Sequence, residues 1–332
     1  MATTITDIAT HLGISKSTVS KALNNATDIS LETKQLILQT AAQMGYINKK
    51  VRNHAKICII IENIDYHTPN QLGYDIILGF KQLVEPEGRI VDIIPVTPDF
   101  QRKIPYDVFM IQEGYQAAFV LGFSLEDPWM NEFRISHFPT VLYDNYIKGS
   151  PNIASIGCDN TEAIEHAIKH LVKLGHKKIG FISGSLDSYI EKERYQAYLS
   201  ALGKYELEIN EKFIGLGNYI SESNRTYIPK LVEQGVTAIL FSHDIRAISA
   251  MTECGDLEIR IPEDISIIGF DDLPIASLCQ PPLTTIRQDR IALGKSAYYA
   301  MTSLLNQVPI SSIQLRATLI VRQSTGPAPK MK

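Results

Sequence analysis

The sequence predicts a small all-α helix-turn-helix head followed by an α/β body made of two doubly wound parallel-sheet lobes. Three observations support this fold class. The first 46 residues contain three short segments with helical periodicity, and each follows a residue that can cap a helix. From residue 57, short runs rich in β-branched residues alternate with helical segments, as in parallel sheets covered on both faces. This alternation occurs as two series of similar length, which indicates two lobes.

Length and composition limit the number of domains and the class of protein. A chain of 332 residues with 45% hydrophobic residues is expected to form two or three domains with real cores. It has no apolar stretch of about 18 residues, and its first residues lack the pattern of a signal peptide, so a cytoplasmic protein with no membrane segment is expected. Four scattered cysteines without a CxxC pair predict neither a zinc site nor a disulfide framework. They are Cys58, Cys158, Cys254 and Cys279.

The first helix is expected to begin at Thr4. Asp7 follows three residues later, so a hydroxyl and a carboxylate can satisfy the free N–H groups at the helix start as a capping box. Gly13 is expected to end the helix, because glycine adopts the left-handed conformation at low cost. The apolar residues of the buried face recur at helical spacing and are Ile5, Ile8, Ala9 and Leu12.

The second helix is expected to be capped by Ser15 and to pack on the first through Val19, Ala22 and Leu23. Its outer face contains only cations and hydrogen-bonding groups, with no acid. These residues are Lys16, Ser17, Thr18, Ser20, Lys21 and Asn24. A helix with such a face fits the DNA major groove and can contact phosphates and base edges. The alternative interpretation is an ordinary helical hairpin with a solvated polar face.

A third helix completes a minimal domain. Ser30 can cap it and Gly45 can end it, and its expected apolar positions are Leu36, Ile37, Thr40, Ala41 and Met44. Residues 1–56 carry seven Lys and Arg against three acids, a net charge of +4, whereas the remainder of the chain carries −8. A basic head on an acidic body favours a nucleic-acid-binding module.

These segments resemble the lactose-repressor (LacI/GalR) family of bacterial transcription regulators. The resemblance rests on TITDIATHLGISKSTVSKALN at 4–24, on ISLETKQLILQTAAQMGY at 29–46, and on motifs further along the chain. It implies a periplasmic-binding-protein-like (type I) body and a homodimer that binds a pseudo-palindromic operator. The DNA-binding residues that the pattern and the resemblance together suggest are Thr4, Ser15, Lys16, Ser17, Thr18, Ser20, Lys21, Asn24, Lys49 and Arg52.

Residues 47–56 form the expected hinge. The resemblance implies a helix whose leucine enters the minor groove, but this chain has Ala55 at that position and Asn48–Lys49 in place of Pro-Asn. A methyl group cannot unstack a base step as leucine does, so either the wedge is weak or the DNA bends by another route. The alternative is a flexible tether.

In the body, expected strands and helices alternate. The strands are expected at 56–61, 90–96, 117–123, 139–144, 178–184, about 212–215, 237–242, 265–270 and 316–321. The helices are expected at 73–84, after each of the next two strands, and at 160–174, 191–202, 221–234, 245–254 and 289–306. The domains are therefore a head at 1–46, a hinge at 47–56 and a body at 57–332. The resemblance implies that lobe one is about 57–156 plus 288–316, and lobe two about 157–287 plus 317–327.

Doubly wound sheets bind ligands at the carboxyl ends of their strands. The expected effector-binding residues lie at or after such ends and are Phe123, Asp144, Arg194, Tyr219, His243 and Asp271. By the resemblance, Arg194 stands where the family's arginine forms bidentate hydrogen bonds with ligand oxygens. Asp271 stands at the position of a ligand-binding aspartate, and Tyr219 at that of an aromatic residue that stacks on the ligand. His243 departs from the family's usual asparagine. Each also has a purely structural alternative, and Asp272 is expected to be structural.

Enzyme classes find no support. GxSxG, Walker A, HExxH and an early GxGxxG are absent, and the adjacent acids Asp271 and Asp272 would point apart on a strand end. A secreted solute-binding protein would share the body but lack the basic head. We therefore expect a transcription regulator, more specifically a repressor, that needs no metal or cofactor. A dimer is expected, because the ending QSTGPAPKMK lacks the leucine-repeat helix that makes tetramers in the lactose repressor. The expected effector is a carbohydrate, with a purine or a sugar phosphate as the alternative.

Overall fold

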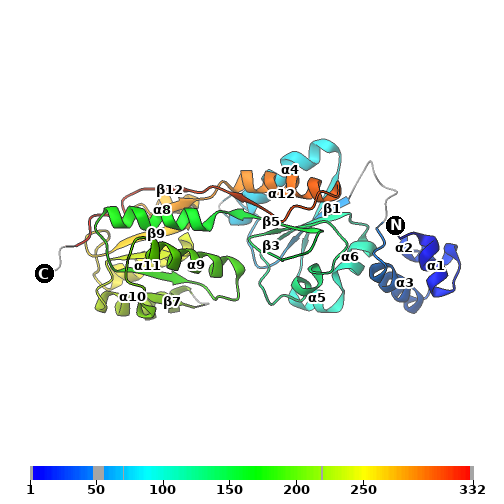
Figure 1. Cartoon of the computed structure of the whole chain (residues 1–332), viewed down its shortest axis with the longest axis horizontal. Coiled ribbons are helices and arrows are strands. Elements are labelled where there is room, and N and C mark those ends of the chain that lie inside the picture. The colour runs from blue at the N-terminus through cyan, green and yellow to red at the C-terminus, as the bar shows by residue number, and fades with distance from the viewer. Residues whose placement is uncertain (1–2, 48–55, 70, 218–219, 330–332) are drawn as a thin grey trace. The chain divides into compact units, whose positions relative to one another are not determined.

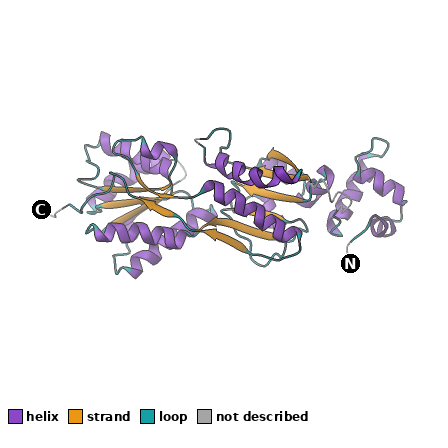
Figure 2. Ribbon diagram, turned by 90° about the horizontal axis from the view of Figure 1, so that it is seen from above, coloured by secondary structure: helices purple, strands orange, loops and turns teal. Residues whose placement is uncertain are grey.

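The computed structural model describes residues 3–47, 56–69, 71–217 and 220–329. The chain divides into two compact units, which we call unit 1 (1–64, 76–156 and 291–313) and unit 2 (65–75, 157–290 and 314–332). Each unit contains one six-stranded sheet with helices against it (Figures 1 and 2). The predicted fold class is therefore confirmed: a three-helix head precedes two parallel-dominated α/β sheets. Within the described residues, no helix is long and apolar enough to cross a membrane.

The head, within unit 1, consists of α1 (Ile5–Leu12), α2 (Lys16–Leu23) and α3 (Leu31–Gln43). The predicted capping box is present, since the amide of Asp7 donates to the Thr4 hydroxyl and the Asp7 carboxylate accepts from the backbone of Thr4. Gly13 follows α1 with φ +65°, as predicted. Ser15 and Ser30 cap the other two helices.

The core of the head forms around Ile8, Val19 and Ile37, none of which is exposed. One predicted core position is wrong: Leu36 is 53% exposed, and Leu38 is buried instead. Successive residues turn by about 100° around a helix, so the face that buries positions 37, 38 and 41 leaves position 36 on nearly the opposite side. The third helix runs to Gln43 with Met44 as its C-cap, and Gly45 follows with φ +66°, in the left-handed conformation expected of the residue that ends the helix.

The sheet of unit 1 has the strand order β11-β5-β4-β3-β1-β2, and the strands from β5 to β2 pair in parallel. Its strands are β1 (Lys56–Ile61), β2 (Ile90–Pro95), β3 (Ala117–Leu121), β4 (Thr140–Tyr143), β5 (Ile153–Cys158) and β11 (Ser312–Leu315). Its helices are α4 (Leu72–Val84), α5 (Pro98–Lys103), α6 (Tyr106–Glu113), α7 (Pro128–Phe133) and α12 (Arg290–Leu305). The sequence did not predict β5 or β11; β11 is an edge strand that alternates between exposed and half-buried residues, so it contains no apolar run.

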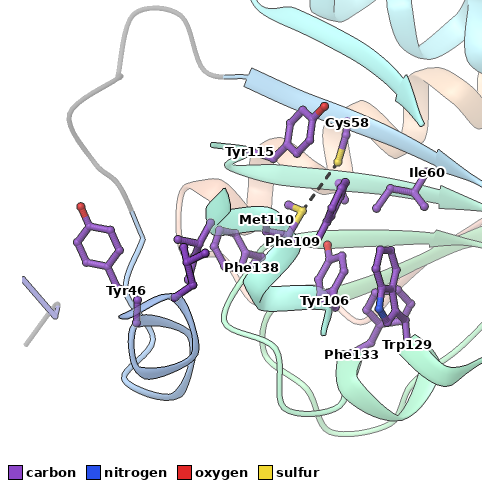
Figure 3. Packing of buried hydrophobic residues seen from close by; sticks show 14 of the residues in the cluster. Tyr46, Cys58, Ile60, Tyr106, Phe109, Met110, Tyr115, Trp129, Phe133 and Phe138 are labelled. Carbon is purple, nitrogen blue, oxygen red and sulfur yellow. Dashed lines mark hydrogen bonds between the residues drawn. The ribbon is translucent and has the colours of Figure 1, made fainter. Parts of the chain in front are cut away.

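Aromatic rings fill the core between this sheet and its helices (Figure 3). The ring of Tyr106 packs edge-on against Phe133 and Trp129, with centroids 4.7 and 5.3 Å away. Its hydroxyl hydrogen-bonds the hydroxyl of Thr140 at 2.6 Å, so this buried polar atom has a partner. The packing fixes α6 and α7 against the strands, and thereby the loops that follow the strand ends.

The sheet of unit 2 has the strand order β12-β10-β9-β8-β6-β7. Its strands are β6 (Ile179–Ser183), β7 (Ile214–Leu216), β8 (Ala238–Phe241), β9 (Ser266–Asp271), β10 (Thr284–Arg287) and β12 (Thr318–Ile320). Its helices are α8 (Asn160–Lys173), α9 (Tyr189–Lys204), α10 (Ile220–Glu233) and α11 (Asp244–Asp256). The sequence did not predict strand β10. It pairs in parallel with β9 and antiparallel with β12.

A close backbone approach in unit 1 gives a stability prediction. Gly122 follows β3 with φ +81°, and a Cβ at this position would lie 1.7 Å from the carbonyl oxygen of Glu62. We expect Gly122→Ala to lower the free energy of unfolding by about 2–4 kcal/mol, because both the backbone conformation and the clash are unfavourable. Chemical denaturation measures this loss.

The matched control is Gly114→Ala. Gly114 has a similar φ of +73°, but no atom lies within 4 Å of the point that its Cβ would occupy, so only the conformational cost of about 1 kcal/mol applies. Equal losses in the two variants would show that the contact with Glu62 does not constrain this loop.

Candidate DNA-binding and effector-binding sites

The outer face of α2 is accessible, as a DNA-reading helix requires. Lys16 and Ser17 are exposed at its first turn, where no acidic residue is present. Ser15 begins the helix, and its hydroxyl accepts from the amide of Thr18 at 3.0 Å. Lys16 and Ser17 therefore stand at the N-terminal end of the helix, the part that contacts bases in helix-turn-helix proteins.

Other predicted DNA-binding residues have partners within the head. Lys21 forms an exposed ion pair with Asp28, and the Asn24 amide donates to the carbonyl of Ser20 at 2.8 Å. The Thr4 hydroxyl belongs to the capping box. An exposed ion pair is weak, so a phosphate can compete with Asp28 for Lys21. Thr18 and Ser20 are half-buried on the same helix, whereas Lys49, Arg52 and Ala55 lie outside the described residues.

In unit 1, two predicted effector residues follow neighbouring strands. The ring of Phe123 is only 6% exposed and packs within the core, 5.9 Å from the ring of Phe133. Asp144 follows β4 with φ +50°, and its amide donates to Ile156 at 2.9 Å. The side chain of Asn145 joins the two strand ends by donating to the carbonyl of Phe123 at 2.6 Å. The Phe123 ring thus contributes to the core.

A cavity of about 420 Å³ opens at the same sheet edge of unit 1. It is lined by Glu62, Asn63, Val96, Thr97, Pro98, Gly122, Ser124 and Asp127. Burial, together with the adjacent Asp127 carboxylate, raises the pKa of Glu62 to about 7. The Gln101 amide donates to Glu62 at 2.5 Å, and the Ser124 amide donates to Asp127 at 2.6 Å. The sequence pattern did not indicate this acid pair, because its members are 65 residues apart in the chain.

In unit 2, the structure brings together Arg194, His243 and Asp271. Arg194 is 4% exposed, and its guanidinium lies 3.6 Å above the centre of the Phe270 ring. One Nη donates to the carbonyl of Ser242 at 2.5 Å, and the other lies 3.7 Å from Asp271. These contacts hold the guanidinium at the carboxyl ends of β8 and β9.

Asp271 and Asp272 have separate partners, as their adjacent positions predict. Asp271 accepts from the Gln288 amide at 2.7 Å, and its burial raises the pKa of its carboxyl, which Arg194 opposes. Asp272 instead accepts from Arg287 and Arg322, each at 2.6 Å. The two carboxylates therefore do not converge on one point, and Asp272 has structural partners.

A second acid lies beside this cluster. Asp244, at the start of α11, accepts from the amide of Leu273 at 2.7 Å and from the hydroxyl of Thr285. Burial, and then the nearby Asp271, raise the pKa of Asp244 to about 8. Through these two hydrogen bonds Asp244 ties α11 to the strand ends that carry Asp271.

Sequence reasoning missed three residues that contact or surround the cluster. Glu191 lies one helical turn before Arg194, and Arg246 one turn after His243, so the spacing of three residues was a usable signal. Gln288 had no local signal, because only the pairing of β9 with β10 brings it to Asp271. Tyr219 lies outside the described residues.

Comparisons with known proteins agree with this architecture. Residues 4–49 match the family "Bacterial regulatory proteins, lacI family", and residues 168–325 match "Periplasmic binding protein-like domain". The chain is 28% identical to the HTH-type transcriptional repressor CytR of Escherichia coli over 99% of its own length and 98% of that protein.

Two solved structures share the fold. One is a complex of the transcriptional regulator CelR with cellobiose, which has a TM-score of 0.71 and 21% identity and covers 97% of this chain and 99% of that one. The other is the lac repressor dimer bound to operator and the anti-inducer ONPF, with a TM-score of 0.69 and 22% identity, covering 98% and 100%.

Proposed function

Because the chain belongs to the lacI family of bacterial regulatory proteins, whose members bind DNA and regulate transcription, we propose that it is a repressor controlled by a small molecule. The observation that carries the proposal is the presence in one chain of an exposed, acid-free α2 face and a cluster of polar side chains at strand ends. The first suits operator DNA and the second suits a small polar ligand.

The proposed effector is a carbohydrate. Arg194 supplies donors in a fixed plane and Asp271 supplies an acceptor, and their guanidinium and carboxylate are 3.7 Å apart. A ligand with neighbouring hydroxyls can donate to one and accept from the other. The CelR complex with cellobiose shows a carbohydrate bound by a protein of the same fold. Predicted contacts from Phe123, Asp144, Tyr219 and His243 belong to the same proposal.

We further propose that the chain acts as a homodimer on a pseudo-palindromic operator in the cytoplasm. Two heads related by a two-fold axis would read two half-sites about one DNA turn, or a multiple of it, apart. The lac repressor dimer bound to operator has this fold and supports the arrangement. The proposed domain limits are a head at 1–46, a hinge at 47–56 and a body at 57–332.

A gel-shift assay tests the DNA half of the proposal. We expect the purified full chain to shift a fragment of the DNA upstream of its own coding sequence at concentrations that leave a random fragment of equal length unshifted. Specific binding typically exceeds non-specific binding by about 10³-fold or more. Equal shifts of the two fragments would contradict sequence-specific binding.

A thermal-shift screen over sugars, sugar phosphates and purines tests the ligand half. A ligand present at about 100 times its dissociation constant should add roughly 2.7 kcal/mol of stability. We expect the largest shift from an unphosphorylated sugar. A larger shift from a sugar phosphate or a purine would replace the carbohydrate assignment with the alternative effector class.

A further inference from the structure

The imidazole of His243 accepts a hydrogen bond from an arginine in the first turn of α11. His243 immediately precedes α11, and its Nε2 lies 3.1 Å from Nε of Arg246, which donates to it. A guanidinium has only donors, so Nε2 of His243 must offer its lone pair. This contact determines which ring nitrogen can carry a proton.

Arg246 is itself fixed by buried contacts. It is 3% exposed, and one Nη donates to the carbonyl of Gly217 at 2.7 Å. Its own carbonyl accepts at 3.1 Å from the amide of Asn224, a fully buried residue of α10. The direction of the Arg246 donor is therefore set by the fold of unit 2 and does not depend on His243.

The charged groups that act on His243 come from two helices. Burial lowers the pKa of His243 to about 4; Glu191 of α9 opposes this, while Arg246 of α11 and Arg194 of α9 add to it. Glu191 is 9% exposed and accepts from the hydroxyl of Ser183. Burial raises the pKa of Glu191, whereas the hydroxyl of Ser183 and the guanidinium of Arg194 lower it. Because Nε2 of His243 accepts from Arg246, it carries no proton, and His243 is neutral at neutral pH.

A neutral imidazole whose Nε2 accepts a hydrogen bond carries its single proton on Nδ1. We propose that Arg246 is a positioning residue that holds His243 in the Nδ1–H tautomer, so that this imidazole can meet an effector only as a hydrogen-bond donor. An asparagine at this position would offer both a donor and an acceptor. The chain would therefore select an effector with an acceptor atom here, such as a hydroxyl or carbonyl oxygen. This selection rests on the proposed function, whereas the tautomer does not.

Nitrogen NMR of the full chain labelled with ¹⁵N-histidine tests the tautomer. The His243→Asn variant assigns the His243 signal. We expect the parent to show a protonated Nδ1 and an unprotonated Nε2, with no titration of His243 between about pH 5.5 and 8. A protonated Nε2, or a titration near the ordinary value of about 6.5, would overturn the proposal. This measurement on the parent needs no destabilising variant.

Arg246→Leu tests the positioning role. Without the guanidinium we expect the His243 signal to show both tautomers and its pKa to rise, since Arg246 is one of the groups that lower it. The matched control is Arg225→Leu, which removes an exposed arginine of α10 that is paired with Glu253 at 3.5 Å. The control should leave the His243 signal unchanged. A parent-like signal in folded Arg246→Leu would overturn the positioning role.

Thermal-shift titrations with ribose and cellobiose as probes test whether His243 selects an effector with an acceptor atom. For a probe that binds the parent, we expect Arg246→Leu to raise its dissociation constant at least threefold, and Arg225→Leu to leave it unchanged. Unchanged binding in Arg246→Leu would overturn the selection while leaving the tautomer result intact. The gel-shift assay on the parent reports separately on the proposed function, so the two failures can be told apart.

Discussion

Replacing Lys16 and Ser17 together with alanine is expected to weaken operator binding by ~1–3 kcal/mol for each base pair whose readout is lost. Both residues are exposed on the first turn of α2, and neither belongs to the core of the head, so the variant should fold normally. Binding to random DNA should change far less, because base contacts contribute only on the correct sequence. Fluorescence anisotropy with operator and random duplexes measures both affinities.

Lys21→Ala is the matched control for this experiment. Its ammonium is paired with Asp28 on the surface, and we expect it to serve phosphate rather than base contacts. The control should therefore weaken operator and random DNA similarly and reduce the salt dependence of both. If the double variant lost equal affinity for the two DNAs, α2 would not be the helix that reads bases.

Arg194→Ala and Asp271→Ala are each expected to weaken effector binding at least tenfold. A charged hydrogen bond contributes about 1.5–3 kcal/mol, and its loss leaves a ligand group without a partner. Because the two side chains are 4% and 5% exposed and lie within one cluster, truncation of either also leaves the other charge less compensated. Melting curves must therefore accompany the titrations, to show that each variant is folded.

Asp272→Asn separates a loss of binding from a loss of stability. Asp272 neighbours Asp271 but pairs with Arg287 and Arg322, so its variant should melt earlier and still respond to the parent's effector concentration. DNA affinity without effector should stay near the parent's in all three variants, since none of these residues is in the head. A folded Arg194→Ala protein with a parent-like effector response would show that the effector binds elsewhere.

The local signals of the sequence predicted the head almost completely. Capping residues such as Thr4 and Ser15, and the helix-ending Gly13, depend on chemistry within a few residues, which the sequence displays directly. The buried face of α3 was predicted less accurately, because Leu36 and Leu38 lie two residues apart and are equally apolar, so that only packing decides between them.

Long-range pairing limited what could be predicted of the body. Strand β10 and the contact of Gln288 with Asp271 arise from the register of β9 on β10, which no local pattern encodes. Phe123 illustrates a different limit: its position after β3 can be read from the sequence, but the packing of its ring beside Phe133 cannot. Arg194 and Asp271 were both predicted to contact one effector, and in the structure their guanidinium and carboxylate lie 3.7 Å apart.

The most direct test of a regulator that couples effector to DNA is a pair of titrations that measure the same coupling from both sides. The dissociation constant of the operator is measured with and without saturating effector, and that of the effector with and without saturating operator. Linkage requires the two ratios to be equal, and we expect each to lie between about 5-fold and 150-fold. An effector that binds equally well to the free protein and to its operator complex would contradict the account.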